Sequence, residues 1–267
     1  MDQPRNLLTQ DRLALYEQLG FLFFDSFLNV SELGDVHDYL TSLGQDRHES
    51  TVLERGSSSI RALHGSHLIS RACDTLSRHE RLVASARSIL NDDVYLYQFK
   101  INMKAPFVGE VWPWHQDYIF WRNEDGMPTS NAVNVVVFLD EVTEFNGPVN
   151  LIPRSHSGGV IEPVAYHASG ERASADDWKE NVSADLKYQI SNETVFDLAE
   201  AGGLAAPKGP PGSVLFFHSN LVHGSAPNVS PYKRRIAILT YNSVKNAPNA
   251  SDLHRPEFLV NRVAAPL

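Results

Sequence analysis

Cysteine is almost absent from this chain. The 267 residues contain one cysteine, Cys73, which excludes an internal disulfide and any metal cluster built from cysteines. This scarcity is typical of a reducing compartment, so we expect a cytoplasmic protein. The sequence also has no apolar run of membrane-spanning length and no basic-then-apolar signal at its start.

Positive charge is scarce as well. Lysine and arginine number 23 against 32 aspartates and glutamates, and the net charge at pH 7 is −9. A nucleic-acid groove or an anionic membrane surface is therefore not expected as a partner. The composition is otherwise that of an ordinary globular protein. We expect one domain over residues 1–267, a monomer or a homodimer, that acts on a small molecule.

The first part of the chain, residues 1–92, is predicted to be mostly helical. Thr9 is a candidate N-cap for a helix that stops at Gly20, and the next four residues, FLFF, predict a buried strand. Further helices are expected over residues 31–44 and 77–91.

Short apolar runs separated by turn signals fill residues 93–245. Strands are expected at 94–104, around 115–117, and at 131–139, 149–152, 213–217 and 235–241. Helices followed by many short strands predict an α+β fold, mainly β, with a sandwich or barrel core. The polar, irregular segment at about 155–205 is long enough to be a lid or an insertion over a site.

The stretch WPWHQDYIFW, residues 112–121, places a histidine and an aspartate among aromatic side chains. In a strand, side chains two positions apart share a face, so His115 and Asp117 would point together and Gln116 would point away. An imidazole nitrogen and a carboxylate oxygen on one face can begin a divalent-metal site. A hydrogen-bonded His–Asp pair on a sheet surface would explain the same triplet.

A further histidine follows a later strand. In GSVLFFHSNLVHGSAPNVSPYKRRIAIL, His223 follows a buried strand and precedes Gly224 and Ser225, where the backbone can turn tightly. Two histidines and one carboxylate leave open positions on a metal, but zinc hydrolases also use three protein ligands. His218 is five positions before His223, which puts the two on opposite faces of a strand, so we leave it out.

Arg234 argues for a particular co-substrate. A strand that returns from the metal would carry this guanidinium deep into the barrel, where it needs an anionic partner. A dicarboxylate that chelates iron at one end and meets the planar fork of Arg234 at the other would satisfy both groups. That ligand is 2-oxoglutarate. Alternatively Arg234 is a solvated charge paired with an acid, as we expect for Arg235 on the opposite face.

The motif His115-x-Asp117, the stretch HGSAPN at 223–228 and Arg234 resemble the phytanoyl-CoA dioxygenase family. YEQLGFLFFDSFL is similar to the opening helix and strand of that family, and NGPVNLIPRSH to its strand and turn after the metal motif. Within the family, WHQDYIFWRNEDGMP and RPEFLVNR resemble the ectoine hydroxylase branch. The resemblance covers most of residues 10–262.

This resemblance implies a double-stranded β-helix, a jelly-roll or cupin-like core, with the N-terminal helices packed outside. It implies an iron(II)- and 2-oxoglutarate-dependent dioxygenase that uses O2 and releases succinate and CO2. His115, Asp117 and His223 would bind the iron and form the catalytic centre. The residues that would contact 2-oxoglutarate are Arg234, Ser225, Lys100, Asn102 and Gln98.

The chain departs from the ectoine hydroxylase pattern near the expected pocket. PWHQD stands in place of HWHSD, and Thr129 stands where an arginine is expected. Ile236 and Ile238 occupy positions of a polar and an aromatic substrate contact. The metal ligands are unchanged, so these differences concern the substrate. Asp117 is also retained where related halogenases have a small residue, which favours hydroxylation.

A small polar substrate is expected, a free amino acid or a cyclic derivative such as ectoine, hydroxylated at an unactivated C–H bond. Arg61 and Arg122 are candidate partners for its carboxylate, although Arg122 could equally lie in a solvated turn. Gln98 is a further candidate contact, and Trp121 resembles a pocket-wall tryptophan of the family. The alternatives are an acyl-CoA or natural-product oxygenase and, outside this class, a non-redox isomerase or hydrolase or an inactive binding module.

Overall fold

The computed structural model describes residues 8–43, 48–163, 178, 186–248 and 255–267. Within these ranges, a seven-stranded sheet has the order β1-β8-β6-β10-β4-β3-β2 and a three-stranded sheet the order β5-β9-β7. Paired strands are antiparallel throughout. The strands are β1 (Phe21–Phe24), β2 (Thr51–Leu53), β3 (Ile60–His64), β4 (Val94–Lys104), β5 (Trp112–His115), β6 (Ala132–Phe138), β7 (Val149–Leu151), β8 (Val214–His218), β9 (His223–Ser225) and β10 (Arg234–Ser243).

Alternate side chains of the large sheet enter two different cores. In β6, Val135 and Val137 pack against the helices, whereas Val136 and Phe138 pack with Leu151 of the small sheet. Successive residues of a strand point to opposite faces, so a strand that is buried on both sides is apolar almost throughout. The arrangement is a double-stranded β-helix whose interior lies between the two sheets, as predicted.

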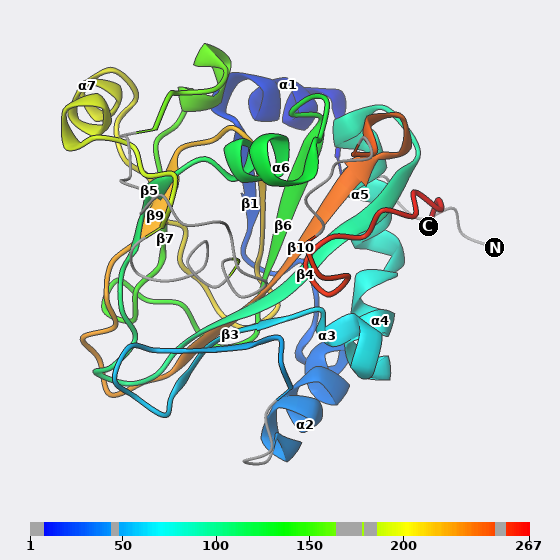
Figure 1. Cartoon of the computed structure of the whole chain (residues 1–267), viewed down its shortest axis with the longest axis vertical. Helices are drawn as coiled ribbons and strands as arrows, with labels where there is room; N and C mark the ends of the chain where they lie inside the picture. Colours follow the sequence, from blue (N-terminus) through cyan, green and yellow to red (C-terminus); the bar gives the residue numbers. More distant parts are fainter. Residues whose placement is uncertain (1–7, 44–47, 164–177, 179–185, 249–254) are drawn as a thin grey trace.

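Helices from the N-terminal part of the chain cover the outer face of the large sheet. The helices of this layer are α1 (Gln10–Leu19), α2 (Gly34–Ser42), α4 (Arg71–Ser77) and α5 (Glu80–Leu90). Figure 1 shows α4 and α5 on the side of this sheet opposite to β5, β7 and β9. The side chain of Thr9 caps α1, and Gly20 ends it with φ at +82°, as predicted. No helix in the described ranges is long and apolar enough to cross a membrane.

Several local predictions were wrong. The helix expected over 77–91 begins three residues later, at Glu80, because Ser77 is the last residue of α4 and His79 caps α5. Strands β2 and β3 were missed; β3 pairs with β4 and β2 pairs with β3, so they extend one edge of the large sheet. The helix expected to end near Gly44 ends at Ser42, and Gly44 lies outside the described residues.

The predicted lid or insertion at about 155–205 lies partly outside the described residues. Its described part contains the 3-10 helix η2 (Ser155–Gly158) and the helix α7 (Asn192–Gly202), which the sequence analysis did not predict. The backbone N–H of Ile190, just before α7, donates to the carbonyl of Trp114 on β5 at 2.9 Å. This part of the segment is therefore attached to the small sheet.

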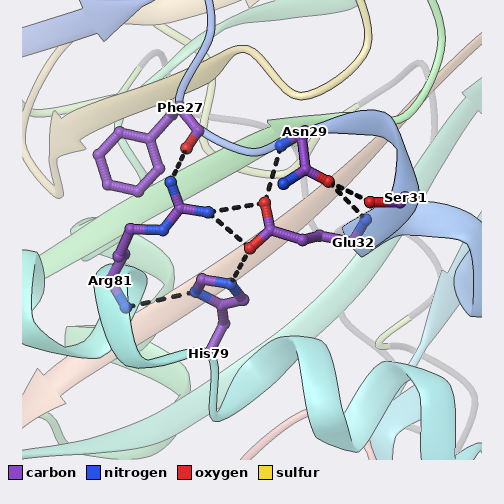
Figure 2. Close-up of polar contacts among 6 residues, drawn as sticks. All are labelled: Phe27, Asn29, Ser31, Glu32, His79 and Arg81. Carbon is purple, nitrogen blue, oxygen red and sulfur yellow. Dashed lines mark hydrogen bonds and ion pairs between the residues drawn. The ribbon is translucent and has the colours of Figure 1, made fainter.

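A network around Glu32 joins the short 3-10 helix η1 (Val30–Leu33) to α5 (Figure 2). Arg81 donates to both carboxylate oxygens at 2.5 and 2.6 Å, and His79 and the backbone N–H of Asn29 lie at 3.0 and 2.8 Å. Partial burial raises the pKa of Glu32, but these partners outweigh it and hold the pKa at about 2. The network fixes the chain between β1 and α2 against the helical layer.

We expect Glu32→Gln to lower the free energy of unfolding by about 1–2 kcal/mol at pH 7. The folded-state pKa lies below the ordinary value of 4.5, so this stabilisation is complete above pH 4.5 and is lost as the pH falls toward 2. Urea unfolding at pH 7 and pH 3.5 should therefore give a smaller difference from the wild type at the lower pH. Asp74→Asn, which removes the exposed pair with Arg78, is the control and should have little effect. An equal difference at both pH values would contradict this account.

Candidate metal centre and active site

The chain changes from strand to helix between the first two predicted metal ligands. His115 ends β5, and Asp117 begins α6 (Asp117–Asp125), with Gln116 between them in extended backbone. The prediction of a strand through Asp117 was therefore wrong, although the two side chains do converge. The first turn of a helix also favours a carboxylate electrostatically, because the backbone N–H groups point toward it.

Gln116 holds this junction in place. Its side-chain amide donates to the carbonyls of Gly159 and Asn220 at 2.8 and 2.6 Å, and its carbonyl accepts from the N–H of Ile161 at 2.8 Å. Gln116 is 1% exposed, and it is not among the described residues that line the pocket. It ties the junction to the loop that leads into β9.

Three side chains converge beside this junction. His115 on β5 and His223 on β9 are register partners, and their Nε2 atoms lie 3.8 and 3.6 Å from the carboxylate oxygens of Asp117. All three residues are buried, and one ligand atom from each lies within 4.8 Å of the others. A single divalent cation could be bound by all three, and iron suits two imidazoles and one carboxylate.

Backbone carbonyls orient both imidazoles. The Nδ1 atom of His115 lies 2.6 Å from the carbonyl oxygen of Pro113, and that of His223 lies 2.9 Å from the carbonyl oxygen of Leu221. A proton on Nδ1 leaves the lone pair of Nε2 for the metal. Burial lowers the pKa of His115 to about 3, and burial also lowers the pKa of His223. Both rings are thus neutral, as metal binding requires.

A hydrogen-bonded chain from the large sheet supports the carboxylate. Asn134 on β6 donates to Asp117 at 2.8 Å and accepts from the hydroxyl of Thr240 on β10 at 2.7 Å. Burial raises the pKa of Asp117, but Lys100, 3.7 Å away, and the hydrogen bond from Asn134 are among the causes that bring it to about 2. The sequence analysis missed Asn134 and Thr240. The signal that would have identified Asn134 is its position as a polar residue in the middle of the valine-rich strand Ala132–Phe138.

A second group of polar side chains lines the same pocket around Arg234. Two of its nitrogens donate to the carbonyl of Gly147 at 3.1 and 2.7 Å, while Nη1 is buried without a partner among the described residues. The hydroxyl of Ser225 is also buried and unpartnered within the described ranges. Two unsatisfied donors in one pocket favour a carboxylate as their ligand.

The surroundings of Arg234 are rich in positive charge. Lys104 is its register partner on β4 and is fully buried, and Arg61 lies close enough to affect both. Burial, Arg234 and Arg61 lower the pKa of Lys104 to about 6, and burial and Arg61 lower the pKa of Arg234 to about 9. An anion bound at Arg234 would offset this excess charge.

The other residues predicted to contact 2-oxoglutarate or the substrate divide into two groups. Gln98, Lys100, Asn102 and Trp121 line the pocket. Gln98 donates to the carbonyl of Leu259 at 2.7 Å, and the side-chain oxygen of Asn102 has no partner among the described residues. These side chains are therefore in position to contact a ligand.

Arg61 and Arg122 are not among the described residues that line the pocket. Arg61 is buried in an ion pair with Glu54 at 3.0 Å, and its guanidinium lies over the ring of Trp112. Arg122 lies at the surface, 4.0 Å from Glu162. The fold thus uses Arg61 to hold neighbouring segments together, and it does not bring either arginine to the pocket.

The sequence analysis missed a cation that does line the pocket, Arg255. Its guanidinium binds Asp125 through both carboxylate oxygens, one of them at 2.7 Å, and the hydroxyl of Tyr97 donates to the same carboxylate. Burial lowers the pKa of Arg255, but Asp125 raises it by more, so the guanidinium stays charged. An arginine in the apolar segment RPEFLV was the available signal.

The rest of the pocket lining is mainly apolar and aromatic. It consists of His64, Trp112, Phe120, Val136, Val149, Leu186, Phe217, Gly224, Ile236, Ile238 and Leu259. An apolar cavity with a few convergent polar groups is typical of a small-molecule site.

The fold and this donor set together define a class, the metal-dependent oxygenases with two histidines and one carboxylate on a double-stranded β-helix. Comparison with known proteins agrees. Residues 16–236 match the family model described as phytanoyl-CoA dioxygenase (PhyH). The chain belongs to the phytanoyl-CoA dioxygenase family, and it is an iron- and 2-oxoglutarate-dependent dioxygenase.

Curated relatives and a solved structure span almost the whole chain. L-proline trans-4-hydroxylase from Streptomyces griseoviridis is 38% identical over 96% of this chain and 94% of its own length. Ectoine dioxygenase from Bordetella bronchiseptica is 33% identical over 96% of this chain and 83% of its own length. The structure of EctD from S. alaskensis with 2-oxoglutarate and 5-hydroxyectoine has a TM-score of 0.80 at 28% identity, covering 98% of this chain and 86% of that one.

We expect Gln116→Leu to weaken iron(II) binding by about 10- to 100-fold, because the residues that orient metal ligands contribute that much. The leucine leaves three backbone groups, one of them fully buried, without their partners, so the junction that orients both ligands loses its support. Anaerobic iron titration measures the affinity. Gln18→Leu on the exposed face of α1 is the matched control. A folded Gln116→Leu variant with wild-type iron affinity would show that the junction does not depend on this side chain.

We expect Arg234→Met to reduce the affinity for 2-oxoglutarate by about 10- to 100-fold, the loss typical of a hydrogen bond to a charged group. Arg235→Met is the matched control, since Arg235 is the next residue and pairs with Asp140 at 2.7 Å. Calorimetric titration of the iron-loaded protein with 2-oxoglutarate, without oxygen, measures the affinity of both variants. Equal losses in the two variants would refute the role of Arg234.

Proposed function

We propose that this enzyme hydroxylates an unactivated C–H bond of a small free amino acid, with L-proline as the leading candidate. The observation that carries this proposal is Arg255, a charged and buried guanidinium that lines the pocket. A free amino acid has a carboxylate that matches a planar guanidinium. The L-proline hydroxylase that is 38% identical over nearly its full length supports the same substrate class.

The geometry supports the remaining roles in this proposal. His115, Asp117 and His223 hold the iron, and Arg234 and Ser225 bind the far carboxylate of 2-oxoglutarate. Iron, when bound, supplies the oxidative chemistry in which 2-oxoglutarate and O2 give succinate, CO2 and a hydroxylated substrate. The chain's own contribution is to hold the substrate carbon close to the metal and to exclude water.

Aromatic side chains next to the metal ligands form the wall that excludes water. The ring of Phe120 packs edge-on against the rings of His115 and Tyr188, with 6.1 and 4.9 Å between the ring centroids. Trp121 is 2% exposed and packs edge-on against Tyr97 at 5.5 Å. A rigid wall of this kind fixes which substrate carbon faces the iron.

Two features favour L-proline over ectoine. Ile236 and Ile238 line the pocket, so it is apolar where the ectoine hydroxylase pattern has a polar and an aromatic contact. Thr129, at the position of an expected arginine, is bound to the side chain of Asn246 at 2.7 Å. The ring of L-proline contains three CH2 groups and one nitrogen, whereas the ring of ectoine contains two nitrogens, so L-proline offers less polar surface to this wall of the pocket.

The same pocket disfavours an acyl-CoA. Lys100, Arg234 and Arg255 are the lysine and arginine side chains among its described lining residues, and Arg234 is assigned to 2-oxoglutarate. The several phosphates of an acyl-CoA would need more cations than the two that are left. A natural-product intermediate that carries a carboxylate remains a second candidate on the strength of Arg255.

We expect L-proline to stimulate succinate formation when the protein is supplied with iron(II), ascorbate, O2 and 2-oxoglutarate. Mass spectrometry should detect the amino acid with one added oxygen. His223→Ala should abolish turnover, whereas His218→Ala should retain it, because His218 is not among the described residues that line the pocket. The same assay is run with a panel of other compounds, namely other amino acids, ectoine and an acyl-CoA. Stronger stimulation by ectoine or by the acyl-CoA would refute the proposal.

A further inference from the structure

His64 is a buried polar side chain that lines the pocket, and one of its ring nitrogens is unpartnered within the described part of the chain. It ends β3 opposite Lys100 on β4, so the two side chains share the face of the sheet that lines the pocket. The residue is 5% exposed, and its Nε2 atom is buried without a hydrogen-bond partner among the described residues. An imidazole nitrogen left unpaired in an apolar pocket is unfavourable unless a ligand meets it.

The backbone and ring of His64 are held firmly. Its N–H donates to the carbonyl of Ser50 at 3.1 Å, and the N–H of Gly65 donates to the carbonyl of Phe99 at 2.8 Å. The ring packs edge-on against Trp178 at 5.8 Å. A side chain fixed in this way presents its nitrogen in one direction and loses little entropy when it binds a ligand.

The C-terminal segment closes over the turn that follows His64. Gly65 has φ at +62°, and a Cβ there would lie 2.4 Å from the Cβ of Phe258, so the turn and this segment are in close contact. Arg255 and Leu259 from the same segment line the pocket together with His64. His64 therefore lines the same pocket as Arg255, the proposed partner of the substrate carboxylate.

The charges that act on His64 are both positive. After burial, Lys100 and then Arg255 are the groups that lower its pKa, which falls to about 3, and no acidic group contributes. The imidazole is therefore neutral and carries one N–H. Lys100 and Arg255 already lie beside Asp117 and Asp125, and the neutral N–H of His64 adds a further hydrogen-bond donor for an anionic ligand group next to Arg255.

We propose that His64 is a specificity-determining residue that donates its Nε2–H to the carboxylate of the amino-acid substrate, beside Arg255. This inference rests on the proposed function, since it assigns a second contact to the same substrate group. It predicts that the enzyme distinguishes a free carboxylate from an uncharged amide through His64. A histidine present only for packing would make no such distinction.

The test compares L-proline with L-prolinamide, which has the same ring and no carboxylate. Calorimetry of the iron- and 2-oxoglutarate-loaded enzyme without oxygen measures binding of each, so the readout does not depend on turnover. His64→Phe keeps an aromatic ring against Trp178 but removes the donor. We expect it to weaken L-proline binding by about 10- to 100-fold, the contribution of a hydrogen bond to a charged group, and to leave L-prolinamide binding unchanged.

His64→Gln retains an N–H donor without the ring and should keep part of the preference for L-proline. His67→Leu is the matched control, because His67 also has a buried, unpartnered nitrogen but packs on Phe99 and is not among the described lining residues. It should bind both ligands as the wild type does. The affinity for 2-oxoglutarate should be the same in all three variants and reports that the site is intact.

The outcomes separate this inference from the proposed function. If His64→Phe weakens the binding of L-proline and L-prolinamide equally, or if it retains the full preference for L-proline, His64 does not recognise the carboxylate. In that case the inference is wrong and the proposed function is unaffected. If the wild type binds another free amino acid instead, the same comparison is made with that amino acid and its amide. If the wild type binds no free amino acid, the proposed function fails, and the role of His64 fails with it.

Discussion

Three hydrogen bonds to one buried side chain, that of Gln116, determine where the chain leaves β5 and enters α6. Strand geometry sets the direction of His115, and helix geometry sets the direction of Asp117, so their convergence depends on the angle of this junction. The same side chain binds the carbonyl of Asn220, close to His223 in the chain. One interaction therefore relates all three proposed metal ligands to one another.

The two sheets contribute different parts of the site. The small sheet supplies His115, His223 and Ser225, whereas the large sheet supplies Arg234 and, through Asn134, the support for the carboxylate ligand. Because strand side chains alternate, Arg234 shares its face of β10 with the apolar residues of the interior. The proposed iron ligands and the proposed 2-oxoglutarate partner thus meet in the space between the sheets.

Buried charge explains why this interior needs an anion. Arg255 is balanced by Asp125, and Arg61 by Glu54, each within the fold. Arg234 is bound to a carbonyl and retains an unpartnered nitrogen among the described residues, beside the fully buried Lys104. A dicarboxylate co-substrate supplies the charge that this part of the pocket lacks, since an unpaired buried cation is costly.

The sequence by itself predicted most strands of the core, because short apolar runs between turn signals are a local feature, and its short motifs and family resemblance singled out His115, Asp117, His223 and Arg234. It could not decide which cations line the pocket. Arg61 and Arg255 are both arginines in largely apolar segments, but Arg61 binds Glu54 away from the pocket lining, whereas Arg255 lines it while bound to Asp125, 130 residues earlier in the chain. The helical position of Asp117 and the supporting role of Asn134 were likewise decided by tertiary contacts, namely the hydrogen bonds of Gln116 and the pairing of β6 with β10. Pairings between distant segments leave no local spacing in the sequence, and only the folded chain brings their partners together.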